Sequence, residues 1–204
     1  MSLKTVPLPH QEDTLKWTLS LDSYGRVKTG GVIANAMGTG KSLVMYQMIL
    51  DEIALGGSAL IVCPLPVLHQ HYDGIKKHTT LDQVCIYHGP KRDPKWAQKA
   101  QIVLTTYDVV RYDPSITSFP HTMLFLDEAH IIKNQDTKIF KQCMMLPMPK
   151  RWCLTGTPYQ NRRENVISLA CFVRASPYHL SSWWPHASQE EINIWLADYY
   201  FQGT

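Results

Sequence analysis

The sequence lacks several features that would place it in other classes of protein. None of its five cysteines forms a Cys-x-x-Cys pair or lies at zinc-type spacing from a histidine, so neither a zinc site nor a disulfide framework is expected. No apolar run approaches the roughly 18 residues of a membrane span, and residues 1–30 lack the apolar core of a signal peptide. We therefore expect a protein inside the cell with no membrane partner. The cysteines stand singly, mostly within apolar runs, and are expected to be buried free thiols of a reducing compartment: Cys63, Cys85, Cys143, Cys153 and Cys171.

A strong charge of one sign is also absent. The formal net charge is +3 over 204 residues, which permits binding of nucleic acid but does not by itself suggest it. No internal repeat or low-complexity segment is present. The hydrophobic fraction of 45% is ordinary for a globular protein. Length and composition thus predict one α/β domain of generous size, or one domain with a short appendage.

Short apolar runs alternate with helical patterns along the chain. Near-continuous apolar strands of this kind predict a parallel sheet that is covered by helices on both faces. In such sheets, ligands bind beyond the carboxyl ends of the strands. Ser188 and Glu191 resemble a capping box that opens a last helix. Strands are expected at residues 32–35, 59–63, 83–87, 102–105, 123–126 and 152–155, and other helices at residues 7–19, 42–55, 67–77 and 135–145.

The segment Gly31–Ser42 has the pattern of a phosphate-binding loop. A short apolar run leads into Gly38 and Gly40, whose flexible backbone lets N–H groups surround an anion at a helix N-terminus. Lys41 would direct a positive charge toward the terminal phosphates, and the hydroxyl of Ser42 would bind Mg²⁺. The strict pattern requires glycine at position 35, where this chain has asparagine. A glycine-rich turn ahead of an ordinary helix is therefore the alternative interpretation.

An acidic pair, Asp127 and Glu128, ends the most apolar expected strand. Downstream of a phosphate loop, the first carboxylate would hold Mg²⁺ beside Ser42. The second would polarise the attacking water. The alternative is an acidic pair that caps the next helix. His130 would relay contacts from the nucleotide to the following motif.

Taken together, these motifs resemble the N-terminal RecA-like lobe of the Snf2 family, the superfamily 2 ATPases of chromatin remodellers and related DNA translocases. The resemblance covers about residues 6–175 and implies a RecA-like three-layer α/β sandwich with a mostly parallel central sheet. Seven blocks carry it in the family's order: Leu8–Gln11 with Trp17, Ala34–Ser42, Leu60–Pro64, Tyr87–Gly89 with Arg92, Val103–Asp108, Leu126–His130 with Ile132–Asn134, and Leu154–Pro158 with Gln160, Asn161 and Glu164.

The resemblance implies a DNA-dependent ATPase that uses ATP and Mg²⁺, located in the nucleus if its source is eukaryotic or viral. Lys41, Asp127 and Glu128 would be catalytic, and Ser42 with Asp127 would ligate Mg²⁺. Residues 155–157 would couple hydrolysis to movement: Thr155, Gly156 and Thr157. Nucleotide contacts are implied for Gln11, Met37, Gly38, Thr39, Gly40, Lys41, Ser42 and His130.

Double-stranded DNA is the partner that the resemblance implies, bound along its backbone without regard to sequence. Hydroxyls, backbone amides and lysines suit phosphate contacts, which position a protein without reading bases. Such binding is expected to weaken with salt. The basic patch at residues 91–99 is more simply a solvated surface. The implied DNA contacts are Pro64 with its neighbour Leu65, Thr105, Thr106, Lys133 and Asn134.

Several positions depart from the family pattern. Asn35 and Ala36 stand where two acidic residues are usual, which removes negative charge near the phosphates. Thr39 and Ser42 replace the common leucine and threonine, although serine keeps the hydroxyl. His71 and Gly74 stand where tryptophan and glutamate are usual, which predicts a different packing for that helix. Ala129 replaces a frequent glycine.

Half of the family's active site has no counterpart in this sequence. The resemblance implies a second RecA-like lobe with an arginine finger, and such a finger contributes on the order of 10³–10⁵ in rate. We therefore expect residues 1–175 to be the ATP-binding lobe and residues 176–204 a helical extension toward the second lobe. Hydrolysis by this lobe alone is expected to be weak.

Two other functions stay open. A strand-separating helicase of the same superfamily would share the nucleotide site, but the blocks at residues 87–89 and 132–134 favour the translocase. A non-catalytic module would bind nucleotide or a partner without turnover. The intact Lys41, Asp127 and Glu128 argue against it.

Overall fold

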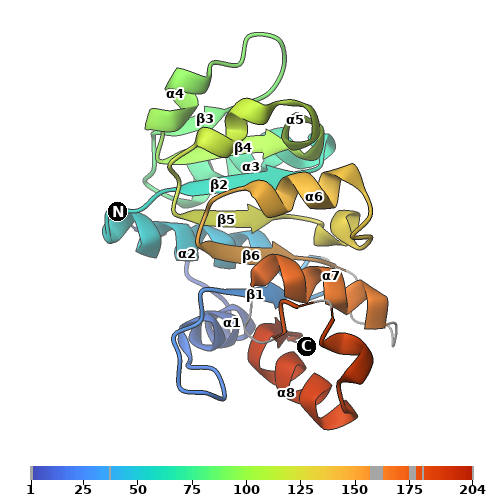
Figure 1. Cartoon of the computed structure of the whole chain (residues 1–204). Helices are drawn as coiled ribbons and strands as arrows, with labels where there is room; N and C mark the ends of the chain where they lie inside the picture. Colours follow the sequence, from blue (N-terminus) through green and yellow to red (C-terminus); the bar gives the residue numbers. More distant parts are fainter. Residues whose placement is uncertain (1, 37, 157–162, 175–177, 181, 204) are drawn as a thin grey trace.

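The computed structural model describes residues 2–36, 38–156, 163–174, 178–180 and 182–203. Within these ranges, seven strands form one sheet in the order β3-β4-β2-β5-β6-β1-β7, and all neighbouring pairs run parallel (Figure 1). The expected parallel sheet is confirmed. The strands are β1 (Gly30–Ile33), β2 (Ala59–Cys63), β3 (Val84–Ile86), β4 (Ile102–Thr106), β5 (Met123–Leu126), β6 (Lys150–Leu154) and β7 (Tyr200–Phe201).

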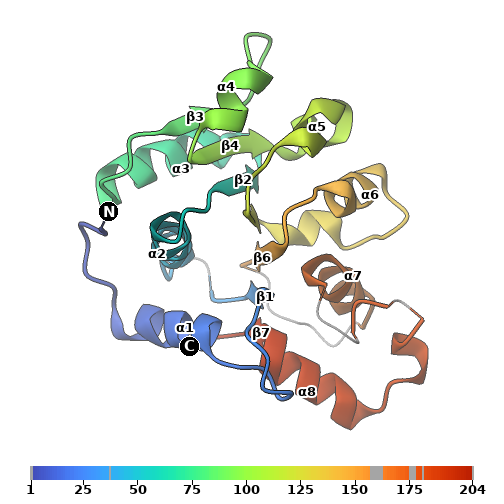
Figure 2. The ribbon, with the colours of Figure 1, turned by 60° about the vertical axis from the view of Figure 1, so that its left-hand side comes forward.

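Helices cover both faces of the sheet, which gives the three-layer sandwich that the sequence predicted (Figure 2). Helices α1 to α3 share one hydrophobic core with one face of the strands, whereas α5 to α8 share the other core. The helices are α1 (Pro9–Leu19), α2 (Lys41–Ala54), α3 (Leu65–His78), α4 (Pro94–Lys99), α5 (Tyr107–Tyr112), α6 (Lys138–Met145), α7 (Arg163–Val173) and α8 (Gln189–Tyr199), with 3₁₀ turns at Pro114–Ser118, Ala129–Ile132 and Trp184–His186.

Local capping explains where several helices begin. Ser188 and Glu191 form the predicted capping box at the start of α8. The hydroxyl of Thr137 accepts a hydrogen bond from the Phe140 amide, so α6 begins at residue 138 rather than 135. Helices α4, α5 and α7 were not expected from the sequence. The first two have six residues each, too few for a helical period to emerge.

The C-terminal segment contributes to the same sheet and core. Strand β7 pairs with β1 through Tyr200 and Phe201, and it was not predicted because two residues carry no alternation pattern. The side chains of Trp184 and Trp195 are fully buried. Trp17 of α1 packs against Phe201 at a ring distance of 5.3 Å. The division at residue 175 stays a prediction, but it crosses a continuous core.

The five cysteines are free and buried, as predicted. Burial raises the pKa of the Cys63 and Cys143 thiols to about 12, so both are inert as nucleophiles at neutral pH. None of the helices in the described ranges has the length and apolar character needed to cross a bilayer.

Candidate nucleotide-binding site

A pocket of about 650 Å³ lies at the carboxyl ends of β1 and β5. The sheet order places β6 between these two strands, so the phosphate loop after β1 and the acidic pair after β5 face a common space. Seven predicted site residues line this pocket: Gln11, Gly38, Gly40, Lys41, Ser42, Asp127 and Glu128. The sequence therefore predicted the sides formed by the phosphate loop and the acidic pair, but not the side formed by α3. Met37 lies outside the described residues.

The backbone of the phosphate loop has the form that the glycines predicted. Gly38 and Gly40 have φ values of 81° and 78°, in the left-handed region that favours glycine. At Gly40 a Cβ atom would also lie 2.3 Å from Nε2 of Gln11. Gly40 caps α2, whose first turn holds no acidic residue. The Leu43 amide bonds the Gly40 carbonyl, and no side chain of Gly40 caps the helix, which leaves the amides of Lys41 and Ser42 to face an anion.

Lys41 is folded back onto its own loop. Its ammonium donates to the carbonyl oxygens of Asn35 at 2.9 Å and Ala36 at 3.0 Å. Burial lowers the pKa of Lys41, while the negative charges of Glu128 and Asp127 oppose that shift. The lysine thus faces the acidic pair across the pocket, and its charge attracts a phosphate there.

Helix α1 holds the loop from outside through Gln11 and His10. The amide of Gln11 donates to the carbonyl of Thr39 at 3.0 Å, and its oxygen accepts from the Leu8 amide at 2.9 Å. A ring nitrogen of His10 lies 2.9 Å from the same Thr39 carbonyl. Gln11 is buried, so its position at the pocket edge is fixed. Thr39 itself does not line the pocket.

Asn35 has a structural role that the sequence did not reveal. Its side chain is buried. The amide donates to the hydroxyl of Thr14 at 3.2 Å, and its oxygen accepts from the Gly203 amide at 2.8 Å. The residue at the position of the missing glycine thus joins α1 and the C-terminal segment to the loop.

The acidic pair is held by its backbone and by its neighbours. The Asp127 amide donates to the Val62 carbonyl at 2.9 Å, and the Asp127 carbonyl accepts from the Tyr107 hydroxyl at 2.7 Å. Oδ1 of Asp127 accepts from the Glu128 amide at 3.0 Å. Glu128 starts a 3₁₀ turn without capping it by its side chain. The geometry therefore disfavours the interpretation of this pair as a helix cap.

Glu128, which lines the pocket, contacts the side chain of His130. His130 Nδ1 lies 3.2 Å from Glu128 Oε2, and the histidine side chain is half exposed. His130 does not line the pocket. The contact of His130 with nucleotide stays a prediction. In the structure, His130 contacts Glu128.

A residue that sequence reasoning did not assign to the site, His71 of α3, contacts Asp127. Its Nε2 lies 2.8 Å from Oδ2 of the carboxylate, and the ring is 4% exposed. These two residues are 56 positions apart. The only signal in the sequence was that histidine replaces the usual tryptophan at position 71.

The donor set fits a magnesium ion that is shared with phosphates. Ser42 and Asp127 line the same pocket, and Mg²⁺ typically takes one or two carboxylates together with waters and phosphate oxygens. Among the described residues, no group of three or more histidine, cysteine or acidic side chains could form a protein-only metal cage. The arrangement thus suits an ion that arrives with its nucleotide.

The predicted DNA contacts fall into two groups. Lys133 and Asn134 are exposed after the Ala129–Ile132 turn, and Pro64 caps α3 at the end of β2. Thr105 and Thr106 are buried. Their hydroxyls are bonded to the Tyr87 carbonyl at 2.8 Å and to His88 Nδ1 at 3.3 Å.

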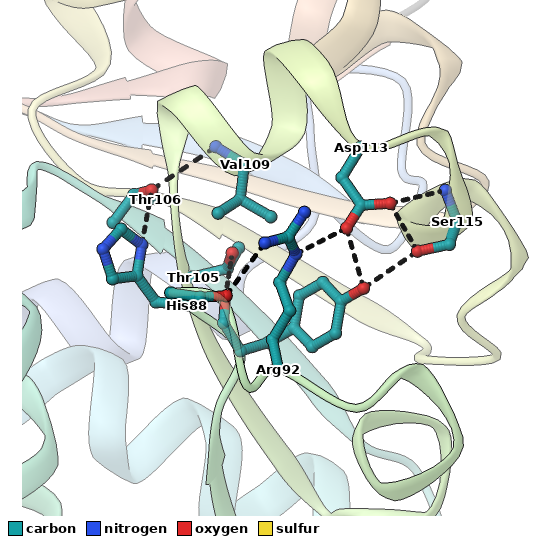
Figure 3. A network of polar contacts seen from close by, with 9 residues as sticks. His88, Arg92, Thr105, Thr106, Val109, Asp113 and Ser115 are labelled. Carbon is teal, nitrogen blue, oxygen red and sulfur yellow. Dashed lines mark hydrogen bonds and ion pairs between the residues drawn. The ribbon is translucent and has the colours of Figure 1, made fainter.

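Figure 3 shows that the hydroxyls of Thr105 and Thr106 belong to an internal network rather than to a free surface. Asp113 is its centre: the carboxylate accepts from Arg92 Nε at 2.7 Å and from the Tyr87 hydroxyl at 2.9 Å. Burial opposes ionisation, but these bonds and those from Ser115 lower the pKa of Asp113 to about 2. The network fixes the loop after β3 against the end of β4.

The residues predicted to couple hydrolysis to movement, 155–157, begin directly after β6. The Thr155 amide donates to the Ile33 carbonyl at 3.0 Å, which continues the pairing of β6 with β1 toward the pocket. Gly156 follows it, and Thr157, Gln160 and Asn161 lie outside the described residues. The coupling role of residues 155–157 stays a prediction.

The fold and the pocket define a class of protein: a RecA-like α/β domain with a phosphate loop and an acidic strand end. Within that class, the chain belongs to the SNF2-related domain family, whose model matches residues 10–200. The match includes both the phosphate loop and helix α8.

Two curated relatives and one solved structure illustrate the similarity. The DNA repair protein RAD5B of Arabidopsis thaliana is 30% identical over 216 residues, covering 85% of this chain and 17% of that protein. A probable global transactivator of Orgyia pseudotsugata multicapsid polyhedrosis virus is 32% identical over 181 residues, covering 84% of this chain and 36% of that protein. The SWI2/SNF2 ATPase core of Sulfolobus solfataricus in complex with dsDNA has a TM-score of 0.78 at 24% identity, covering 98% of this chain and 44% of that one. The chain therefore spans about a third or less of the length of these curated relatives.

Proposed function

We propose that this chain is the ATP-binding lobe of a DNA-dependent ATPase that moves along double-stranded DNA. The observation that carries the proposal is the common pocket in which Lys41 and Ser42 face Asp127 and Glu128. Family membership supports the same function, since the domain family is that of SWI2/SNF2 ATPase cores. The relatives' DNA-related names and the solved complex with dsDNA support DNA as the partner.

The residues of the pocket divide the chemistry among them. The open amides of α2 and the ammonium of Lys41 would hold the phosphates, and Lys41 would exchange its two carbonyl acceptors for phosphate oxygens. Ser42 and Asp127 would hold Mg²⁺, which neutralises charge on the transferred phosphoryl group when bound. Glu128 would orient the attacking water and accept its proton, a role that contributes typically 10²–10⁴ in rate.

Two partners complete the proposal. A second RecA-like lobe would supply the arginine finger, so hydrolysis by the lobe alone would be weak. DNA would contact the exposed Lys133 and Asn134 and the start of α3 at Pro64. Because the hydroxyls of Thr105 and Thr106 are engaged internally, these two residues would contribute through their backbone and through the rigidity of their loop.

Binding of a fluorescent ATP analogue to this chain tests the nucleotide site. Lys41→Ala should abolish binding, whereas Glu128→Gln should retain it. Lys141→Ala, which removes an exposed lysine on α6, is the matched control and should bind as the wild type does. Equal binding by Lys41→Ala and wild type would overturn the proposal.

Hydrolysis by a protein that also contains the second lobe tests the motor function. We expect duplex DNA to stimulate it, and Glu128→Gln to remove at least about 10²-fold of that rate. Stronger stimulation by single strands than by duplexes would favour the strand-separating helicase instead. Binding without DNA-stimulated turnover would favour the non-catalytic module.

A further inference from the structure

Two buried polar side chains, Tyr46 and His71, connect helix α2 to Asp127, one of the residues expected to ligate Mg²⁺. Tyr46 lies one turn after Ser42 in α2, and its hydroxyl reaches helix α3. That hydroxyl lies 3.2 Å from Nδ1 of His71, and Nε2 of His71 lies 2.8 Å from Oδ2 of Asp127. The hydrogen-bonded series thus runs Tyr46–His71–Asp127, from α2 through α3 to the end of β5.

The contacts define which ring nitrogen of His71 carries a proton. An ionised carboxylate only accepts hydrogen bonds, so Nε2 must donate to Asp127. Nδ1 is then free to accept from the Tyr46 hydroxyl. The second oxygen of Asp127 takes the Glu128 amide. Each carboxylate oxygen therefore has one fixed donor, and the plane of the carboxylate is set from two directions.

Burial and a neighbouring glycine hold Tyr46 and His71 in this arrangement. Tyr46 is 3% exposed and His71 is 4% exposed, so neither can exchange its partner for water without cost. Gly74, one turn after His71 on α3, makes room for the tyrosine: a Cβ there would lie 2.5 Å from the Tyr46 hydroxyl. The two positions at which α3 departs from the family pattern, 71 and 74, are thus the two that accommodate Tyr46.

We propose that His71, supported by Tyr46, is a positioning residue that fixes the Asp127 carboxylate relative to Ser42 for Mg²⁺-bound nucleotide. His71 does not touch nucleotide or metal in this role; it acts through Asp127. The inference rests on the proposed nucleotide site and deepens it. Outer partners of metal-ligating carboxylates commonly contribute 10–100-fold to metal affinity or activity.

A matched pair of substitutions separates the bond to Asp127 from the bulk of the ring. His71→Gln places an amide nitrogen near the position of Nε2 and keeps a donor for Asp127. His71→Asn places it near Nδ1, within reach of Tyr46 but too short for Asp127. His69→Asn changes an exposed histidine on the same helix and serves as the control.

The readout is the gain in affinity for a fluorescent ATP analogue when excess MgCl₂ replaces EDTA. We expect His71→Asn to reduce this gain on the order of tenfold and to leave affinity in EDTA unchanged. His71→Gln should restore most of the gain, and His69→Asn should match the wild type. Tyr46→Phe keeps the ring and should reduce the gain by a smaller factor than His71→Asn. Urea unfolding of each variant verifies that it is folded.

Two results would overturn the inference. An undiminished Mg²⁺ gain in both His71→Asn and Tyr46→Phe would show that Asp127 needs no positioning. An equal loss of affinity with MgCl₂ and with EDTA, unrelieved in His71→Gln, would show that His71 only packs. Failure of the proposed function is distinguishable, because it appears in the Lys41→Ala comparison, and it would remove this inference with it.

Discussion

Glu128 combines its proposed catalytic role with a backbone conformation that favours glycine. Its φ and ψ are 52° and 49°, a left-handed conformation that costs a residue with a Cβ roughly 1–2 kcal/mol. With this backbone conformation, the carboxylate of Glu128 lies at the pocket beside Asp127 and contacts His130. Residues in such conformations often occur at functional sites, where the surrounding fold imposes them.

This strain predicts an unusual order of stability at position 128. Glu128→Gly relieves the left-handed strain, whereas Glu128→Ala does not. We expect the glycine variant to have the higher free energy of unfolding, by about 1 kcal/mol, as measured by urea denaturation. In most loops and helices alanine is the more stable of the two. Alanine as the more stable variant here would contradict the strained conformation of Glu128.

Between elements, a buried carboxylate ties the loop after α1 to helix α8. Asp22 accepts from the Tyr199 hydroxyl at 2.7 Å and from the amides of Tyr24 and Arg26 at 2.9 Å each. Burial opposes ionisation of Asp22. The hydrogen bonds from Tyr199, Arg26 and Tyr24 nevertheless lower its pKa from 3.8 to about 2. Next to it, Asp198 of α8 accepts from the amide and hydroxyl of Ser23.

The lowered pKa of Asp22 predicts how stability depends on pH. Because the unfolded state takes up the proton first as pH falls, the contribution of Asp22 is complete above about pH 4 and lost toward pH 2. Asp22→Asn should therefore cost about 2 kcal/mol at neutral pH. That difference should fall to a small fraction of this value near pH 2 and vanish below it. Urea denaturation at the two pH values measures it, and Asp13→Asn, at an exposed position, should show no such dependence. A constant cost at both pH values would contradict the assignment.

Over the whole molecule, sequence predicted what local patterns specify and missed what distant contacts decide. The phosphate loop, the acidic strand end and the parallel sheet follow from short-range signals such as Gly38-x-Gly40 and the apolar run before Asp127. The bond between His71 and Asp127 joins residues 56 positions apart, and that between Asn35 and Gly203 spans 168. No spacing rule in a single sequence reports such pairs. For the same reason, the burial of the Thr105 and Thr106 hydroxyls was not foreseen.

Helix α8 and the Trp184–His186 turn pack into the same hydrophobic core as helices α5 to α7. Trp195 of α8 is fully buried, 5.6 Å from the ring of Trp184. Its indole nitrogen has no hydrogen-bond partner in the part of the chain that the structure describes. The residue thus contributes packing rather than a polar contact.

Substitution at Trp195 tests whether residues 176–204 form a separate appendage. Trp195→Ala should lower the free energy of unfolding by about 3–5 kcal/mol within a single cooperative transition. Trp195→Phe keeps most of the aromatic volume and removes an N–H that has no partner among the described residues, so it should cost less than half as much. Circular dichroism and nucleotide binding should report the same transition. A separate transition, with the nucleotide site intact, would instead support the division at residue 175.

The hydrogen bond from Gly203 to Asn35 also couples the C-terminal segment to the phosphate loop. The side-chain oxygen of Asn35 accepts a hydrogen bond from the Gly203 amide, and its backbone carbonyl accepts one from the ammonium of Lys41. Asn35 thus connects the segment after β7 to the ammonium of Lys41, which faces the pocket. A pull on that segment is transmitted to the loop through two hydrogen bonds and one peptide unit. A displacement of Gly203 would therefore also move a carbonyl that holds the ammonium of Lys41.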